Sequence, residues 1–215
     1  MSVSGLFVPG RGAPAGIYRG AVPAGWEILD PPSFVASGAT VAAYRRWIVE
    51  RCCERPGLFT LAGHSFGAVL AVHAALAEGV EVERLVLVGP SALPLDKPVR
   101  LMFWDFSRRV AAGWFPPREA ARAVRQVLFH PLLARRLGMA VRAIDLSEEL
   151  EQLRERGLPC TIVAASIDTL TPPSLCRRVA DLCGGDYREL DVPGGHLWFL
   201  SARDLLASEL SAGGG

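Results

Sequence analysis

The sequence has no excess of charge of either sign. Its 215 residues include 23 basic and 22 acidic side chains, so the formal net charge is +1 at pH 7. A protein that binds nucleic acid mainly by electrostatics carries a basic surplus, and a solvated tail carries runs of one sign. We therefore expect no nucleic-acid partner. Half of the residues are hydrophobic, which is typical of a single globular domain and predicts one over residues 1–215.

The sequence also lacks the long hydrophobic runs of exported or membrane-spanning chains. Its first ten residues, MSVSGLFVPG, contain neither the charged n-region nor the long apolar h-region of a secretory signal. The longest apolar run, at residues 68–77, is interrupted by His73 and falls well short of the roughly 20 residues that cross a bilayer. We therefore expect a cytoplasmic protein without a membrane span.

Cysteine and histidine are few and are poorly spaced for metal binding. The five cysteines form no C-x-x-C pair and have no histidine at ligand spacing. They are most simply buried thiols of a reducing compartment. The glycine-containing PGRG at residues 9–12 lacks the Lys-Ser/Thr ending of a P-loop and the third glycine of a dinucleotide fingerprint. No metal or cofactor is therefore expected.

Short apolar segments alternate with amphipathic or alanine-rich segments along most of the chain. The apolar segments are GLFVPG, GWEILDPP, PGLFTLAG, ERLVLVGP, PCTIVAAS and DYRELDVPGG. The intervening helices are expected at residues 40–54, 66–78, 146–156, 173–182 and 197–210. Continuous apolar character in LFTLAG and RLVLVG indicates strands that are covered on both faces. The pattern predicts a doubly wound α/β fold with about six mostly parallel strands and helices on both faces.

One long segment interrupts this alternation. Residues 94–143 show no strand pattern, only helix-compatible stretches separated by Pro116, Pro117 and Pro131. Insertions at strand ends often form lids over a site. We therefore predict a helical cap insertion at about residues 94–143.

The pentapeptide GHSFG at residues 63–67 has the G-x-S-x-G pattern of a nucleophile elbow, between an apolar strand and a helix. Its glycines suit a strained turn that crowds together the residues two before and two after the serine. A serine N-cap in a packed turn would explain the same residues without chemistry. As an elbow, the motif makes Ser65 a nucleophile and places the backbone amide of Phe66 where it can donate to an oxyanion.

A serine hydroxyl needs a neighbouring base, and the chain has only four histidines. His64 lies inside the elbow and is expected to point away from the serine. His73 falls in the middle of a predicted helix, and His130 lies in the insertion without an obvious partner. His196 follows the last strand in a glycine-flanked loop, so it is the expected base.

The acid that orients this histidine should follow an earlier strand of the same sheet. Asp168 in TIVAASIDTLTPP does so, although a turn cap would also explain an aspartate there. Asp30 and Asp96 also follow strands and are the alternatives. The chain order Ser65, Asp168, His196 is typical of one of the three well-known triad folds.

Over residues 6 to about 210 the sequence resembles the α/β-hydrolase superfamily. The resemblance rests on VPGRG, WEILDPP, LAGHSFGA, RLVLVGPSA, SIDTLTPP and VPGGHLWF. It implies a triad of Ser65, His196 and Asp168, an oxyanion hole from the backbone amides of Arg11 and Phe66, and a helical cap over the pocket. Two features differ from the usual pattern. The antiparallel N-terminal strand pair is missing, so this is a minimal version of the fold, and PG at residues 9–10 replaces the His-Gly of many relatives.

The predicted cap is strongly basic. Residues 100–142 contain nine arginines and two acids. A solvated helical face would explain this positive charge without any function. Alternatively, the cap docks an anionic carrier protein, a phosphate-bearing group such as CoA, or a lipid surface. The arginines are Arg100, Arg108, Arg109, Arg118, Arg122, Arg125, Arg135, Arg136 and Arg142. Nearby aromatic residues that pack the cap or line an acyl pocket are Phe103, Trp104, Phe106, Trp114, Phe115, Phe129 and Trp198.

These features predict a serine hydrolase that cleaves a carboxylic ester of small to medium acyl chain through an acyl-enzyme at Ser65. The alternative is a thioesterase or carrier-protein ester hydrolase that docks an anionic partner on the cap. A lyase and a non-catalytic binding module are further alternatives, but a pure binder has no need of Asp168 and His196 in those loops. A small-molecule ester or thioester is the expected substrate.

Overall fold

Six strands form one parallel sheet in the computed structural model, which describes residues 5–96 and 117–212. Their order across the sheet is β2-β1-β3-β4-β5-β6, and every neighbouring pair runs parallel. The strands are β1 (Gly5–Val8), β2 (Trp26–Ile28), β3 (Phe59–His64), β4 (Val82–Val88), β5 (Cys160–Ala165) and β6 (Asp186–Leu190). Since all the strands point the same way, their carboxyl ends lie along one edge, where open α/β sheets bind ligands.

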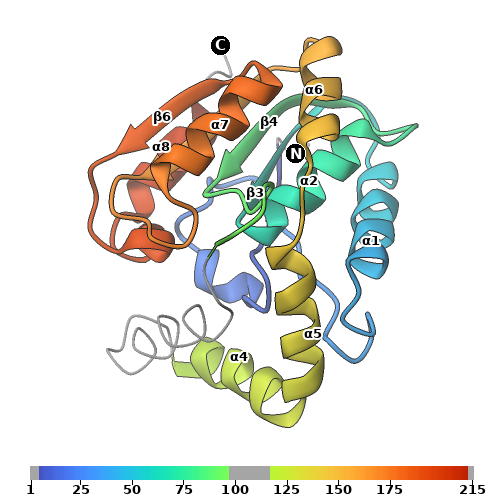
Figure 1. Ribbon diagram of the computed structural model, residues 1–215, viewed down its shortest axis with the longest axis vertical. Helices are drawn as coiled ribbons and strands as arrows, with labels where there is room; N and C mark the ends of the chain where they lie inside the picture. Colours follow the sequence, from blue (N-terminus) through green and yellow to red (C-terminus); the bar gives the residue numbers. More distant parts are fainter. Residues whose placement is uncertain (1–4, 97–116, 213–215) are drawn as a thin grey trace.

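Helices cover both faces of this sheet (Figure 1). Leu6 of β1 belongs to one core cluster and its neighbour Phe7 to the other, because successive side chains of a strand point to opposite faces. One face packs against α1 (Val41–Cys53), α2 (Phe66–Leu76), α6 (Ser147–Glu155) and α7 (Pro173–Cys183). The other packs against the 3-10 helices η1 (Ala15–Tyr18) and η2 (Gly195–Leu200) and against α8 (Arg203–Ser211). The predicted doubly wound α/β fold is confirmed.

Between β4 and β5, residues 89–96 are irregular, and the described residues from Pro117 on are mainly helical. This part of the chain contains α4 (Pro117–Phe129) and α5 (Pro131–Arg142), which lie together at the lower end of the view in Figure 1. Pro131 starts α5 at a helix position where its missing N–H costs nothing. Ala134, Leu137 and Val141 of α5 join the core cluster on the α1 and α2 face. Among the described residues, no helix has the length and apolar character needed to cross a membrane.

The helix predicted at residues 197–210 is wrong in its first part. The chain instead forms η2, breaks at residues 201–202, and only then begins α8. Leu197 has non-helical dihedral angles, and the Ser201 hydroxyl donates to the carbonyl of Trp198 at 2.9 Å. Trp198 and Phe199 are both buried in the core. The break thus follows a short 3-10 turn that buries two large aromatic side chains close to His196.

Candidate active site

Ser65 lies in a strained turn between β3 and α2. Its φ of 56° and ψ of −118° are unusual for a non-glycine residue, a conformation that costs on the order of 1–3 kcal/mol. The backbone around it is too crowded for side chains. A Cβ on Gly63 would clash with the Gly67 carbonyl, and a Cβ on Gly67 would clash with the Val8 carbonyl. The glycines predicted from the pentapeptide are thus required sterically.

Asp168 is held rigidly in the loop after β5. Its Oδ1 accepts the backbone N–H groups of Leu170 at 2.8 Å and Thr171 at 3.1 Å, and its Oδ2 accepts the Thr171 hydroxyl at 2.8 Å. Burial by itself would raise the pKa of the Asp168 carboxyl, but the contact with His196 and these donors outweigh it and lower the pKa. The carboxylate is therefore ionised at neutral pH.

His196 connects this carboxylate to the edge of the sheet. Its Nδ1 lies 2.8 Å from Asp168 Oδ2, and the two side chains are only 8% and 2% exposed. An ionised carboxylate can only accept a hydrogen bond, so Nδ1 carries the proton and Nε2 is left as the acceptor. That Nε2 atom is buried and has no hydrogen-bond partner among the described residues. A buried nitrogen without a partner is rare in folded proteins and points to a chemical role.

The Ser65 hydroxyl contacts Ser91, a residue that the sequence analysis did not single out. The two Oγ atoms are 3.2 Å apart, and the Ser91 N–H donates to the Ser65 carbonyl at 3.3 Å. Ser91 is 1% exposed and follows β4 in the motif GPSA. The position after a strand end was a signal that could have indicated it. In this structure the Ser65 hydroxyl is therefore bonded to Ser91 and not to the imidazole of His196.

A buried hydrogen-bond chain joins the elbow to the loops on either side of it. The N–H of Gly10 donates to the Tyr18 hydroxyl at 3.0 Å, and the hydroxyl donates to His64 Nδ1 at 2.9 Å. His64 Nε2 in turn donates to the His196 carbonyl at 3.0 Å. His64 thus points away from the serine hydroxyl, as predicted, and supports the backbone of the His196 loop. The sequence analysis did not identify Tyr18, and nothing in its local sequence indicated this contact.

His64 is expected to make the protein less stable as the pH falls below neutral. Burial, helped by the neighbouring His196, lowers the pKa of His64 to about 3. When the pH falls below 6.5, the ordinary pKa of histidine, His64 becomes protonated in the unfolded chain. In the folded chain it stays neutral down to about pH 3. Between pH 7 and pH 5 this residue should therefore cost about 2 kcal/mol of stability.

Urea unfolding of the wild type and His64→Gln at pH 7, 6 and 5 tests this. We expect the variant to be less stable at pH 7 and to lose less stability on acidification, with a smaller proton uptake on unfolding. A variant that loses as much stability between pH 7 and pH 5 as the wild type would contradict a neutral, buried His64.

The turn after β1 contains the first predicted oxyanion donor. Gly10 packs directly against the elbow, since a Cβ there would lie 3.4 Å from Ser65 Cβ. Its own N–H is used by Tyr18, and the Ala13 N–H donates to the Gly10 carbonyl at 3.1 Å. For the N–H of Arg11, by contrast, the described residues provide no acceptor. The N–H of Phe66 lies at the start of α2, where a helix has no acceptor for it.

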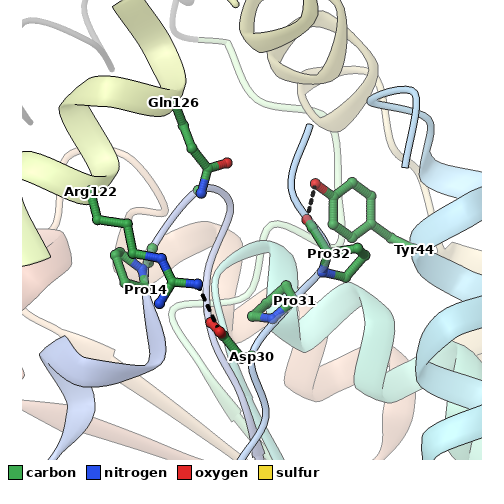
Figure 2. A pocket seen from close by; sticks show the side chains of 9 residues that line it. Pro14, Asp30, Pro31, Pro32, Tyr44, Arg122 and Gln126 are labelled. Atoms are coloured by element: carbon green, nitrogen blue, oxygen red, sulfur yellow. Dashed lines mark hydrogen bonds and ion pairs between the residues drawn. The ribbon is translucent and has the colours of Figure 1, made fainter. Parts of the chain in front are cut away.

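The alternative acids lie elsewhere. Asp30 forms an exposed ion pair with Arg122 of α4 at 2.7 Å, and the carbonyl of Asp96 accepts from the guanidinium of Arg142. The Arg122–Asp30 ion pair drawn in Figure 2 borders a small, open hollow between the turn after β1, the segment after β2, and α4. Residues that line the hollow are Gly12, Ala13, Pro14, Asp30, Pro31, Pro32, Tyr44, Arg122 and Gln126.

Six of the nine cap arginines fall within the described residues, and all six are exposed: Arg118, Arg122, Arg125, Arg135, Arg136 and Arg142. Large apolar side chains are exposed on the same two helices, with Phe129 at 72% and Leu132 at 78%. Trp198 is buried in the core, with 1% of its surface exposed. The other predicted cap residues lie outside the described residues: Arg100, Phe103, Trp104, Phe106, Arg108, Arg109, Trp114 and Phe115.

The site therefore combines a serine in an elbow, a histidine with one free buried nitrogen, and an ionised aspartate, all after the ends of parallel strands. A family model described as the alpha/beta hydrolase family matches residues 6–209. The chain belongs to the alpha/beta hydrolase family. Membership supports hydrolase activity, and the resemblance seen in the sequence is confirmed.

Solved structures with the same fold share little sequence with this hydrolase. An esterase (EaEST) from Exiguobacterium antarcticum is 17% identical, with a TM-score of 0.72, over 98% of this chain and 91% of that one. A lipase-esterase related protein from Clostridium acetobutylicum is 17% identical, with a TM-score of 0.69, over 96% and 92% of the two chains. A thioesterase domain from the curacin biosynthetic pathway is 19% identical, with a TM-score of 0.63, over 97% and 90%. No curated protein matches the sequence.

Proposed function

We propose that this hydrolase cleaves carboxylic esters through an acyl-enzyme at Ser65, with His196 as the base and Asp168 as the group that orients it. The observation that carries the proposal is the state of the His196 imidazole. One of its nitrogens lies 2.8 Å from a buried carboxylate, and the other is buried without a partner. A buried ring held in one tautomer with its acceptor nitrogen unused is suited to taking a proton.

In the first step the Ser65 hydroxyl turns from Ser91 towards His196 Nε2 and attacks the ester carbonyl carbon. Its proton passes to Nε2, and the ionised Asp168 stabilises the imidazolium that forms. The leaving alcohol takes the proton from Nε2 as the carbon–oxygen bond breaks. Water then repeats the sequence on the acyl-enzyme and releases the acid. The Ser91 hydroxyl gives the resting Ser65 hydroxyl a partner until substrate arrives.

The carbonyl oxygen becomes negative in both steps and needs donors that are already in place. We assign this role to the backbone N–H groups of Arg11 and Phe66. Gly10 packs against Ser65, so the turn containing Arg11 lies beside the nucleophile, and Phe66 adds the favourable dipole at the start of α2. The hydrogen bond from Gly10 to Tyr18 fixes this turn.

A thioesterase or carrier-protein ester hydrolase is the second candidate. The observation that favours it is the surface of α4 and α5, where exposed arginines lie among exposed apolar side chains such as Leu128 and Leu132. Arginine suits phosphate and carboxylate groups, so this surface would fit an anionic carrier that delivers a thioester. A thioesterase domain is among the solved structures with the same fold, which is consistent with such chemistry.

We expect the preferred substrate to be an oxygen ester with a small to medium acyl chain. A cap of this size leaves room for a modest pocket. Hydrolysis of p-nitrophenyl esters from acetate to palmitate should reach its highest kcat/KM at or below a medium chain. A rate that rises steadily to the longest chain would contradict this.

Acyl thioesters of the same chain lengths separate the two candidates. An oxygen-ester preference supports the first candidate. A kcat/KM at least tenfold higher for thioesters, falling as salt screens the cap arginines, would instead favour the second.

A further inference from the structure

Arg11 lies in the turn that packs on the nucleophile but does not belong to the proposed triad. It follows Gly10, the residue that packs on Ser65, and its guanidinium reaches α5, where Nη1 donates to the Ala134 carbonyl at 3.3 Å. Tyr44 of α1 lies close enough to interact with it electrostatically. The cation is therefore held between the oxyanion turn, α1 and α5.

This guanidinium has no negatively charged partner among the described residues. Within residues 5–96 and 117–212 no carboxylate forms an ion pair with Arg11. Its one electrostatic partner there is the Tyr44 phenol, which burial keeps neutral by raising its pKa. Burial also lowers the pKa of Arg11 itself, which means that the surroundings disfavour the charge. A half-buried cation is costly unless something compensates it.

The guanidinium also has donors to spare. It carries five N–H groups in a planar fork, and the described residues accept a bond from only one nitrogen, Nη1. Arg122, which lines the hollow between α4 and the turn after β1, is by contrast paired with Asp30 at 2.7 Å. The small hollow beside Arg122 begins at Gly12, the residue after Arg11, so the turn that contains Arg11 lies at the edge of this hollow.

We propose that Arg11 binds a carboxylate of the substrate, and that the substrate class is the half esters of dicarboxylic acids. The inference rests on the proposed function and deepens it. The acyl group stays attached to Ser65 beside the Arg11 turn through both chemical steps, so a carboxylate on the acyl chain can remain bound throughout. A planar fork matches a carboxylate in a bidentate manner, and one arginine balances its single charge. Arg11 would thus have two roles: its backbone amide donates to the oxyanion, and its guanidinium binds the carboxylate.

Matched ester pairs test the side chain separately from the amide. The probes are p-nitrophenyl half esters of dicarboxylic acids from adipate to suberate, each compared with the analogue whose free carboxylate is a methyl ester. The readout is the ratio of kcat/KM for the acid over kcat/KM for the methyl ester, corrected for the uncatalysed rate. Any general loss of activity in a variant cancels in this ratio.

For the wild type we expect a ratio of about 10 to 100 at the best chain length, the range for a charge-assisted hydrogen-bonded pair. Arg11→Gln should lower the ratio to 1 or below, and Arg11→Lys should give an intermediate value because it keeps the charge but loses the fork. Arg46→Gln on the exposed side of α1 removes the same charge and should leave the ratio unchanged. That control separates a local contact from long-range attraction.

Three outcomes decide between the possibilities. A wild-type ratio near 1, or one that survives in Arg11→Gln, overturns the inference even if Ser65-dependent hydrolysis of the neutral esters is observed. If neither ester is hydrolysed, the proposed function fails. The inference is then judged by calorimetric titration with adipate and suberate, where binding lost in Arg11→Gln sustains it and absence of binding in the wild type overturns it.

Discussion

Ser65→Ala is expected to lower kcat for ester hydrolysis by about 10⁴- to 10⁶-fold, leaving only the rate that the oxyanion donors and binding provide. Alanine removes the attacking Oγ but keeps the Cβ that packs against Gly10. KM should change little, because the hydroxyl is used for attack and not for binding. The measurement is steady-state hydrolysis of the best p-nitrophenyl ester, with kcat calculated per molecule of folded protein.

Ser208→Ala is the matched control for this loss. Ser208 lies on the exposed side of α8, where its hydroxyl donates to the Leu205 carbonyl at 2.8 Å. This variant should keep wild-type kinetics. An alanine at position 65 that retains more than a few per cent of the wild-type kcat would show that the hydrolysis takes place at another nucleophile.

Asp168→Asn is expected to lower kcat by about 10³- to 10⁴-fold at neutral pH with little change in fold. The carboxylate accepts from the Nδ1–H of His196 at 2.8 Å and so keeps Nε2 free to act as the base. An asparagine can turn its amide N–H groups towards Nδ1, which favours the opposite tautomer and protonates the nitrogen that must accept the serine proton. It also loses the negative charge that stabilises the imidazolium.

The loss should fall on kcat more than on KM, and unfolding should stay two-state. Asp191→Asn removes a charge from an exposed aspartate that accepts the Ser166 hydroxyl at 3.1 Å, so it controls for the change in net charge. If Asp30→Asn lowered kcat as strongly as Asp168→Asn, the orienting acid would be wrongly assigned.

The sequence predicted the parts of the site that each follow a strand. Ser65, Asp168 and His196 each follow a predicted strand, and the carboxyl ends of parallel strands meet at one edge of the sheet. Their local surroundings, a glycine pair, a proline-marked turn and a glycine loop, also have direct steric explanations. The strand pattern and most helix boundaries follow from the same local periodicity.

What the sequence could not predict depends on contacts between distant segments. Tyr18 and His64 are 46 residues apart, and His64 and the His196 carbonyl are 132 apart. No local pattern specifies such pairs, and the same holds for the hydroxyl contact between Ser65 and Ser91. The position of the Arg11 guanidinium against α5 also follows from packing between elements, so the sequence indicated only its backbone amide.

The most direct test of the proposed mechanism is labelling with a fluorophosphonate probe, read by intact mass and by peptide mapping. An activated serine reacts with such a probe, whereas an ordinary hydroxyl does not. We predict one label per chain, located in the elbow peptide that contains Ser65, with none in Ser65→Ala and a much slower reaction in His196→Ala. A label that persists in Ser65→Ala, or a wild type that takes up none, would contradict the assignment of Ser65 as a nucleophile activated by His196.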